Sequence, residues 1–402
     1  MSRSRITAAL VLIFLVAGGT GASARPYWKK RIDRFTARRP MSVVLADNGR
    51  RLYQRQPRAH RIPASNQKLV ASMALLDALG PGARLPTIAL ASDVDGGVID
   101  GNLWIVGRGD PAVGGVGFGE GLPFKPTRVG DLARRIDAAG IRRIKGRVVG
   151  ATTYFTHDWY APGWEPDFPA RYVALPSALT FNANTWGGRH IDNPELRAAR
   201  ALTKRLRARG LEVYHRARAG QPPSNTTTVV RVLSRPLKVL LRYMNRQSSN
   251  FYAEVLGKRL AVERHRPPGT IAKGAAAAAA FAAEHGVSIN ALDSSGLSYD
   301  NRVTAGGIAR LLRVAEQASW GGVLRRTLAA PGQGTLEDRP MPGVRMRAKT
   351  GTLENVSALS GYVWLRKSKT WAEFSILSGG MPKSTASSIE DRVLGIVARS
   401  AR

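Results

Sequence analysis

Apolar positions near the start of the chain first follow β-strand spacing and then helical spacing. The runs Met41–Ala46 and Arg50–Gln54 flank Asp47-Asn48-Gly49, and a short Asn-Gly turn between two apolar runs is typical of a β-hairpin. After Pro63-Ala64-Ser65 the apolar residues recur every three or four positions until Gly80-Pro81. This spacing predicts a helix that begins at Ser65 and ends before Gly80.

The pattern changes between about Leu85 and Gln221. Apolar runs become short and β-like, as at Ile88–Ser92 and Leu103–Val106, and glycine is frequent between them. The segment Gln221–Asn225 contains two consecutive prolines and is typical of a linker. We therefore predict a separate, mainly β segment over residues 87–222.

The rest of the chain combines helices with strands. Val344, Met346 and Ala348 alternate with charged residues, which indicates a half-buried strand. The other predicted elements are strands at 227–233, 360–365 and 371–377 and helices within 237–258, 275–283 and 385–398. With the N-terminal hairpin, these elements predict an α/β (α+β) domain of residues 25–86 and 223–402, whose sheet uses both ends of the chain.

Residues 1–24 have the pattern of a secretory signal peptide. Arg3 and Arg5 precede an apolar run from Ile6 to Gly19, and Ala22-Ser23-Ala24 supplies a small-x-small cleavage site. The run is short for a membrane span, and an uncleaved anchor is the alternative. We expect an exported protein of the periplasm or the extracellular cell envelope.

Composition excludes several kinds of chemistry. The chain has no cysteine, which excludes disulfides, thiol nucleophiles and thiolate metal sites. Its six histidines are scattered without the spacing of metal ligands, so we expect neither a metal nor a cofactor. The formal net charge is +33, but the basic residues are dispersed and no basic-aromatic nucleic-acid motif stands out. We expect a general attraction to an anionic cell envelope and no specific nucleic-acid partner, and the oligomeric state stays open.

Three short motifs follow one another along the chain. They are Ser65-Asn66-Gln67-Lys68, Ser248-Ser249-Asn250 and Lys349-Thr350-Gly351. A serine hydroxyl needs a base within hydrogen-bond reach to act as a nucleophile, and a lysine one helical turn away can supply it when burial favours its neutral form. Each motif alone has a simpler interpretation, because serine and asparagine often cap helices and a lysine on a strand is often solvated.

Together with their surroundings, the motifs resemble those of the low-molecular-mass class C penicillin-binding proteins. These are serine D-alanyl-D-alanine carboxypeptidases and endopeptidases related to penicillin-binding protein 4. The segments that carry the resemblance are Ile62–Leu69, Val106–Pro111, Asp293–Ser298, Asn301–Thr304, Ala348–Thr352 and Leu359–Val363. The resemblance covers nearly the whole mature chain and implies a penicillin-binding, β-lactamase-like transpeptidase fold with an inserted accessory domain.

The resemblance also implies catalytic roles. Ser65 would be the acylated nucleophile and Lys68 its general base. Ser248 would relay a proton to the leaving amine, while Asn250 would orient Lys68 and the substrate amide. Lys349 would hold Ser248 and set the electrostatics of the cleft.

Substrate contacts are implied for the third motif. Thr350 and Thr352 would hold the C-terminal carboxylate of the substrate, and Gly351 would allow another backbone or a ligand to approach closely. The backbone N–H groups of Ser65 and Thr352 would form the oxyanion hole. The implied partners are peptidoglycan stem peptides and β-lactam antibiotics, which would acylate Ser65.

Two features depart from the family pattern. Ser249 stands where the family commonly has Asp, a position without a catalytic role in this scheme. The family also carries two accessory domains between the first two motifs, one nested in the other. Here Ser177–Asn184 matches, but the chain then passes quickly to a predicted helix and strand at Leu202–Val213. We expect the nested domain to be absent or reduced to a loop near Trp186–Pro194.

The leading hypothesis is therefore an exported serine DD-peptidase that cleaves D-Ala-D-Ala, with endopeptidase action on peptide cross-links left open. A serine β-lactamase shares the three motifs but has no need of the 179 residues between Lys68 and Ser248 (69–247). A catalytically silent, basic cell-wall-binding protein is the third possibility, although every motif residue is intact.

Overall fold

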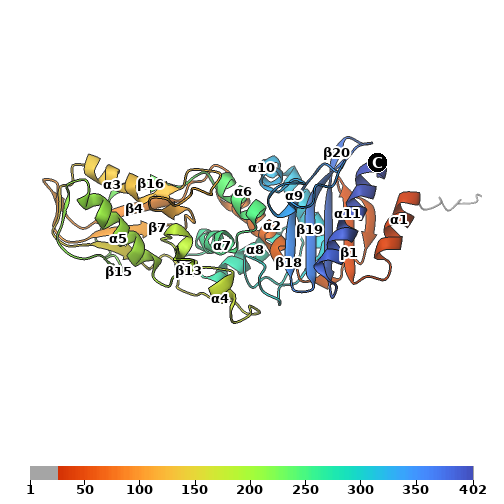
Figure 1. Cartoon of the computed structure of the whole chain (residues 1–402), viewed down its shortest axis with the longest axis horizontal. Helices are drawn as coiled ribbons and strands as arrows, with labels where there is room; N and C mark the ends of the chain where they lie inside the picture. The colour runs from red at the N-terminus through yellow and green to blue at the C-terminus, as the bar shows by residue number, and fades with distance from the viewer. Residues whose placement is uncertain (1–25, 402) are drawn as a thin grey trace, which may run out of the picture.

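The computed structural model describes residues 26–401, and the predicted signal peptide lies outside the described residues. The molecule is elongated, with one lobe built from both ends of the chain and another built from its middle (Figure 1). We call these the terminal lobe (residues 27–79 and 237–400) and the accessory lobe (residues 86–151 and 185–233). Among the described residues, every helix is too short or too polar to span a lipid bilayer.

The terminal lobe is organised around a five-stranded antiparallel sheet. Its strand order is β18 (Met346–Leu353), β19 (Val356–Leu365), β20 (Thr370–Gly379), β1 (Met41–Asp47) and β2 (Arg50–Arg55). The N-terminal hairpin thus pairs through β1 with the C-terminal strand β20, which confirms the prediction that the sheet uses both ends of the chain.

Both faces of this sheet are covered. Val43 and Leu45 pack into the cluster beneath α1 (Tyr27–Thr36) and α11 (Lys383–Ser400), whereas Val44 packs into the cluster of the other face. Successive side chains of a strand point to opposite faces. The run Val43–Ala46 in β1, apolar at consecutive positions, is therefore what a sheet buried on both sides requires.

The second face carries a layer of helices. They are α2 (Gln67–Leu79), α6 (Leu237–Gln247), α7 (Asn250–Arg264), α8 (Ile271–Glu284), α9 (Ala305–Gln317) and α10 (Gly321–Thr327). A short ladder of β3 (His60–Arg61) and β17 (Val303–Thr304) joins this layer to the segment before α2. Helix α2 lies inside the layer, and all its residues from Gln67 to Leu76 are buried. The first predicted motif is therefore placed on a rigid, central element.

The accessory lobe contains two main sheets and two helices that pack against each other on the larger sheet. It also has two small two-stranded sheets, one of β8 (Val113–Gly114) with β9 (Thr127–Arg128) and the other the hairpin that precedes α5. The strands of the larger sheet, in order, are β15 (Arg218–Gly220), β11 (Val148–Ala151), β7 (Leu103–Gly107), β4 (Pro86–Ala91) and β16 (Thr227–Leu233). Those of the smaller sheet are β14 (Glu212–Val213), β10 (Arg143–Ile144), β6 (Val98–Ile99) and β5 (Val94–Asp95). The helices are α3 (Val129–Ala138) and α5 (Pro194–Arg207), which connect parallel strands.

The strand β16 shows where the sequence-based boundary differs from the structure. We placed the end of the accessory domain at residue 222, but β16 pairs with β4 from Thr227 to Leu233. The chain returns to the terminal lobe only at α6. The proline-rich segment connects β15 to β16 within the accessory lobe. Its composition could not reveal this, because proline and serine are typical of loops both within a domain and between domains.

The segment from residue 152 to 184 runs from the accessory lobe back to the terminal lobe. Phe155 bridges to Gly269, and the indole nitrogen of Trp164 donates a hydrogen bond to Asp293 over 2.7 Å. A two-residue hairpin, β12 (Thr185–Trp186) with β13 (Arg189–His190), then leads directly into α5. Helix α4 (Phe168–Arg171) in this segment lies beside the entrance of the cleft described below.

Candidate active site

Ser65 lies in a short 3₁₀ turn, Ala64–Asn66, directly before α2. Its side chain caps no helix, because neither the 3₁₀ turn nor α2 has a side-chain capping bond at its first residues. Lys68 follows in the first turn of α2 and donates a hydrogen bond to Ser65 Oγ over 2.9 Å. The spacing of three residues thus brings the two groups together as predicted.

Lys68 is fully buried and its ammonium has three acceptors. Besides Ser65 Oγ, it donates to Asn250 Oδ1 over 2.8 Å and to the carbonyl oxygen of Ser295 over 2.6 Å. Burial lowers the pKa of Lys68 to about 7, although the nearby Asp293 and Glu254 oppose this shift. A substantial fraction of Lys68 can therefore be the neutral amine that a general base requires.

The second motif forms the junction between α6 and α7. Ser249 caps α7 by accepting a hydrogen bond from the backbone N–H of Tyr252. Ser248 has left-handed backbone angles (φ 55°, ψ 34°), which few non-glycine residues adopt, and such positions concentrate at functional sites. Asn250 begins α7, and its amide nitrogen donates to the carbonyl oxygen of Tyr172 from the connecting segment over 3.1 Å.

Lys349 links the second and third motifs. It is fully buried at the centre of β18, and its ammonium donates to Ser248 Oγ and to the carbonyl oxygen of Thr350, each over 2.8 Å. Burial lowers the pKa of Lys349 well below its usual range, and the positive charges of Lys68 and Lys383 add to this effect. Two buried lysines thus each hold one serine hydroxyl of the site.

The strand β18 forms one wall of a cleft of about 790 Å³. Thr350 and Thr352 line the cleft, and the Thr350 hydroxyl donates to Thr335 Oγ1 over 2.6 Å. Gly351 does not line it. A Cβ atom on Gly351 would meet the carbonyl oxygen of Pro63 at 2.9 Å, so the absence of a side chain lets β18 pass directly beside the Ser65 segment.

Of the eight residues predicted for the site, five line this cleft: Ser65, Ser248, Asn250, Thr350 and Thr352. Lys68 and Lys349 lie beneath its surface, in contact with the two serines. Other charged residues also line the cleft, and these are Arg171, Arg339, Lys383, Glu165, Asp167 and Glu354. The site therefore lies where the terminal lobe meets the connecting segment.

The loop Asp293–Ser298 has a role that the sequence did not reveal. Its Ser295 carbonyl oxygen is the third acceptor for Lys68, and a Cβ on Gly296 would overlap the backbone of Ala64. Asp293 holds the loop by accepting hydrogen bonds from the backbone N–H groups of Gly296 and Ser298, each over 2.8 Å. The loop therefore sets the position of one of the atoms that orient Lys68.

Glu254 supports the same loop from below. One of its carboxyl oxygens accepts from the backbone N–H groups of Ser294 over 3.0 Å and Ser295 over 2.7 Å. Burial raises the pKa of Glu254 to about 8, and the neighbouring Asp293 adds to the shift. The only signal in the sequence was spacing, since Glu254 follows Asn250 by four residues and so shares its face of α7.

Within residues 26–401, no group of three or more His, Cys, Asp or Glu side chains is placed to hold a metal ion.

Comparisons with known proteins agree with the resemblance seen in the sequence. The model of the D-Ala-D-Ala carboxypeptidase 3 (S13) family matches residues 33–189 and 187–400. A carboxypeptidase of Mycobacterium tuberculosis is 30% identical over 338 residues, which cover 79% of this chain and 71% of the relative.

Solved structures show the same fold. Penicillin-binding protein 4 of Haemophilus influenzae has a TM-score of 0.77 at 19% identity, and the alignment covers 92% of this chain and 99% of that protein. A predatory peptidoglycan endopeptidase of Bdellovibrio bacteriovorus has a TM-score of 0.55 at 16% identity, with 90% and 92% covered. The predicted penicillin-binding fold with an accessory insertion is confirmed. The chain belongs to the D-Ala-D-Ala carboxypeptidase 3 (S13) family and is a serine-type D-Ala-D-Ala carboxypeptidase related to penicillin-binding protein 4.

Proposed function

We propose that Ser65 is acylated by the penultimate D-alanine of a peptidoglycan stem peptide and that water then hydrolyses the acyl-enzyme. The observation that carries this proposal is the pair of hydrogen bonds in which Lys68 holds Ser65 and Lys349 holds Ser248, at the base of one cleft. Ser65 Oγ attacks the carbonyl carbon while its proton passes to Lys68 Nζ. Ser248 then relays a proton to the amine of the departing D-alanine.

The transition-state oxyanion would be held by the backbone N–H groups of Ser65 and Thr352. The close passage of β18 at Gly351 supports this assignment, because it places the backbone of the third motif beside that of the first. The substrate carboxylate would lie against the hydroxyls of Thr350 and Thr352. The basic side chains of Arg339 and Lys383, which line the cleft, favour a negative charge there.

We extend the proposal to β-lactams and to cross-linked peptides. A β-lactam presents a strained amide to the same nucleophile and should form a persistent acyl-enzyme on Ser65. The cleft volume of about 790 Å³ falls within the usual range of small-molecule sites, and endopeptidase action on cross-linked peptides is included in the proposal.

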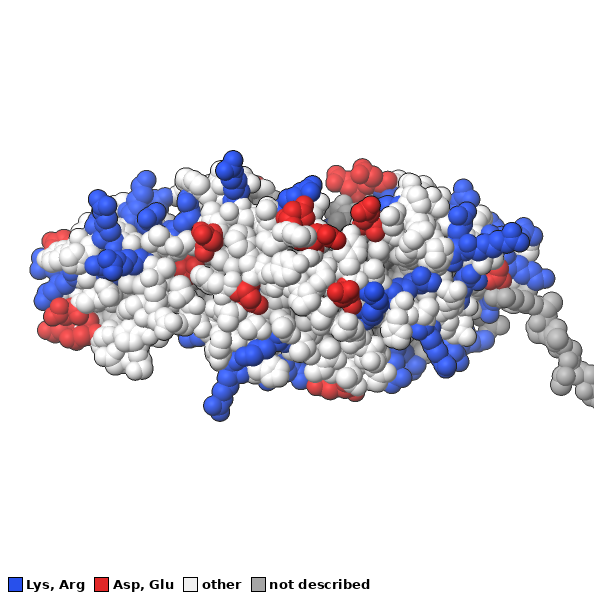
Figure 2. Space-filling model, turned by 90° about the horizontal axis from the view of Figure 1, so that it is seen from below, with Lys and Arg blue, Asp and Glu red and all other residues white. Residues whose placement is uncertain are grey.

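Export by the N-terminal signal remains part of the proposal, with the cell envelope as the site of action. Figure 2 shows Lys and Arg side chains at both ends of the molecule with acidic side chains among them. This dispersed distribution supports a general attraction to anionic wall material, because it forms no single continuous basic track on that face.

The division into a discontinuous catalytic domain and an accessory domain without the nested third domain also stays a proposal.

The decisive experiment incubates the mature protein with pentapeptide muropeptides and with cross-linked dimers, and weighs the products by mass spectrometry. We expect free D-alanine and tetrapeptide from the first substrate and uncrosslinked monomers from the second. Release of neither product by a folded protein would overturn the proposal. Rapid turnover of penicillin, in place of a persistent acyl-enzyme, would instead indicate a β-lactamase.

Glu254 provides a test of how Lys68 is positioned. In Glu254→Ala two buried N–H groups lose their acceptor, at about 1–3 kcal/mol each, and the Ser295 carbonyl oxygen is no longer held against Lys68. We expect acylation by a fluorescent penicillin to slow by about ten- to a hundredfold, because orientation errors at a catalytic group reduce rates steeply.

The matched variant for this test is Glu254→Gln, which keeps an oxygen acceptor at nearly the same place. We expect it to acylate much faster than Glu254→Ala and to retain the pH dependence of the unmodified protein. Equal acylation rates and equal pH profiles for the two variants, at a temperature where both are folded, would show that Glu254 does not position Lys68.

A further inference from the structure

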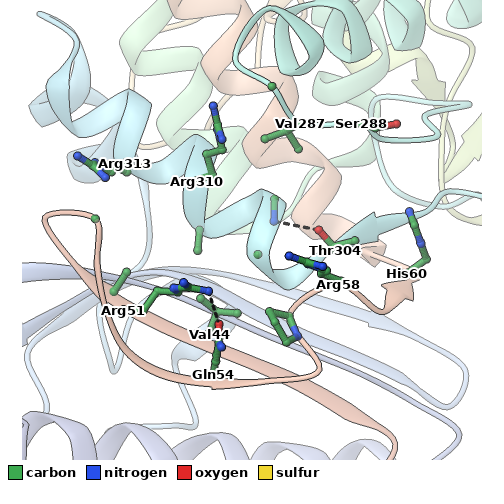
Figure 3. A pocket seen from close by; sticks show the side chains of 17 residues that line it. Val44, Arg51, Gln54, Arg58, His60, Val287, Ser288, Thr304, Arg310 and Arg313 are labelled. Atoms are coloured by element: carbon green, nitrogen blue, oxygen red, sulfur yellow. Dashed lines mark hydrogen bonds between the residues drawn. The ribbon is translucent and has the colours of Figure 1, made fainter.

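A second cavity lies between the β1–β2 hairpin and α9, away from the active-site cleft (Figure 3). Its volume is about 600 Å³, within the range of sites that bind small molecules. None of the residues that line it also lines the cleft that contains Ser65. The cavity is therefore a separate feature of the terminal lobe.

The ionisable side chains that line this cavity are all basic. Arg51, Arg58 and His60 come from the hairpin and the segment that follows it, whereas Arg310 and Arg313 come from α9. The lining contains no Asp or Glu. Like charges gathered in one concave site raise the local positive potential and favour an anionic ligand.

Within residues 26–401, these arginines have few protein partners. Arg58 and Arg313 make no hydrogen bond or ion pair with the described part of the chain, although the charge of Arg313 acts on the nearby carboxyl of Glu373. Arg51 donates only to the side chain of Gln54, over 3.1 Å. Arg310 uses its Nε, which donates to the carbonyl oxygen of His285 over 2.7 Å, so its terminal nitrogens remain free for a ligand.

Two glycine turns shape the cavity around the arginines of α9. A Cβ atom on Gly49 would overlap the guanidinium of Arg313, and one on Gly286 would lie 2.8 Å from a terminal nitrogen of Arg310. Both glycines also have positive φ angles, 78° and 70°. The turns therefore leave room for the two guanidinium groups, which are three residues apart on the same side of the helix.

Gln54, Ser288 and Thr304 add polar side chains to the lining, and the remaining part is apolar. Val44 from β1, Val287 from the loop after α8 and Ala309 from α9 line this part of the cavity. An anion with an attached organic group would satisfy both surfaces, because the group would contact the apolar residues while the anion meets the arginines. A planar guanidinium group can donate two hydrogen bonds to two oxygens of one phosphate. Several arginines can therefore surround a single tetrahedral phosphate.

We propose that this cavity binds the phosphate group of an organic phosphate ester, with the arginines around the phosphate and the organic group on the apolar residues. The same chemistry is offered by a soluble ester and by the headgroup of an anionic lipid. The experiment below distinguishes these two sources.

The test titrates the mature protein with phenyl phosphate, inorganic phosphate and phenol by isothermal titration calorimetry. We expect phenyl phosphate to bind most tightly and phenol not to saturate. The double variant Arg58→Gln/Arg310→Gln should weaken phenyl phosphate binding by at least about tenfold, since it removes two groups that would make charge-assisted hydrogen bonds to the phosphate. In parallel, sedimentation with vesicles of phosphatidylcholine, with and without phosphatidic acid, tests the lipid source.

The matched control is Arg216→Gln/Arg218→Gln, which removes the same charge from exposed residues around β15 of the accessory lobe. Loss of binding in the cavity variant alone supports the proposal. Loss of vesicle binding in the cavity variant would identify a lipid headgroup as the source of the phosphate. Binding of phenyl phosphate by a protein that does not sediment with the vesicles would identify a soluble ester as the source. Equal weakening in both variants, or no saturable binding of phenyl phosphate to the unmodified protein, would overturn it.

Discussion

Ser65→Ala is expected to abolish acylation by β-lactams and the release of D-alanine. The variant removes the nucleophile itself, and the loss of such a group from a serine hydrolase lowers the rate by on the order of a millionfold. Because Ser65 caps no helix, the substitution should leave the fold and the thermal stability nearly unchanged. The measurements are in-gel labelling with a fluorescent penicillin and D-alanine release from a pentapeptide.

The chain offers a matched control for this experiment in Ser249→Ala. Ser249 belongs to the second motif but caps α7, so its loss should destabilise the protein by about 1 kcal/mol while labelling persists. Labelling of folded Ser65→Ala at the rate of the unmodified protein would show that another residue is the nucleophile.

Lys68→Met is expected to have the second-largest effect. Methionine fills a similar volume but cannot accept the proton of Ser65, and the loss of a positioned general base slows a reaction by about 10²–10⁴-fold. The second-order rate constant of penicillin acylation measures the change. Lys258→Met serves as the control, because it removes another buried lysine whose ammonium contacts Asp158 and no residue of the predicted site.

The pH dependence of the unmodified protein follows from the same lysine. Burial lowers the pKa of Lys68 to about 7, so the ammonium predominates below that pH and the free amine above it. Only the free amine can take the proton of Ser65. We therefore expect the acylation rate to fall about tenfold for each pH unit below 7 and to level off above it. A rate that stays constant between pH 5 and pH 9 would contradict a titrating Lys68 base.

Local patterns in the sequence predicted many helices and strands of both lobes. The hairpin from Met41 to Gln54 and the strand from Thr227 to Leu233 occur where the apolar spacing placed them. The helix predicted from Ser65 exists as a 3₁₀ turn that continues into α2. Such features depend on residues close together in the chain, so periodicity and turn residues are enough to reveal them.

Pairings between distant segments were not visible in the same way. The strand β16 was predicted correctly, but its partner β4 lies more than a hundred residues earlier, so the domain boundary was misplaced. The acceptor role of the Ser295 carbonyl has no signal in its residue type, because every residue carries such an oxygen. Gly351 was expected to contact substrate or backbone, and only the fold shows that it faces Pro63.

The sequence by itself determined the chemistry of this protein, since the motif order and the surrounding segments identify a serine peptidase family and its candidate nucleophile. The tertiary structure decided which groups surround that nucleophile. Lys68 has a pKa near 7 because the packing of α2, α7 and the Asp293–Ser298 loop removes it from water, and no local pattern encodes that desolvation. The arginine cavity has the same origin, because its two arginine groups come from segments roughly 250 residues apart in the sequence and only the packing of α9 against the hairpin brings them together.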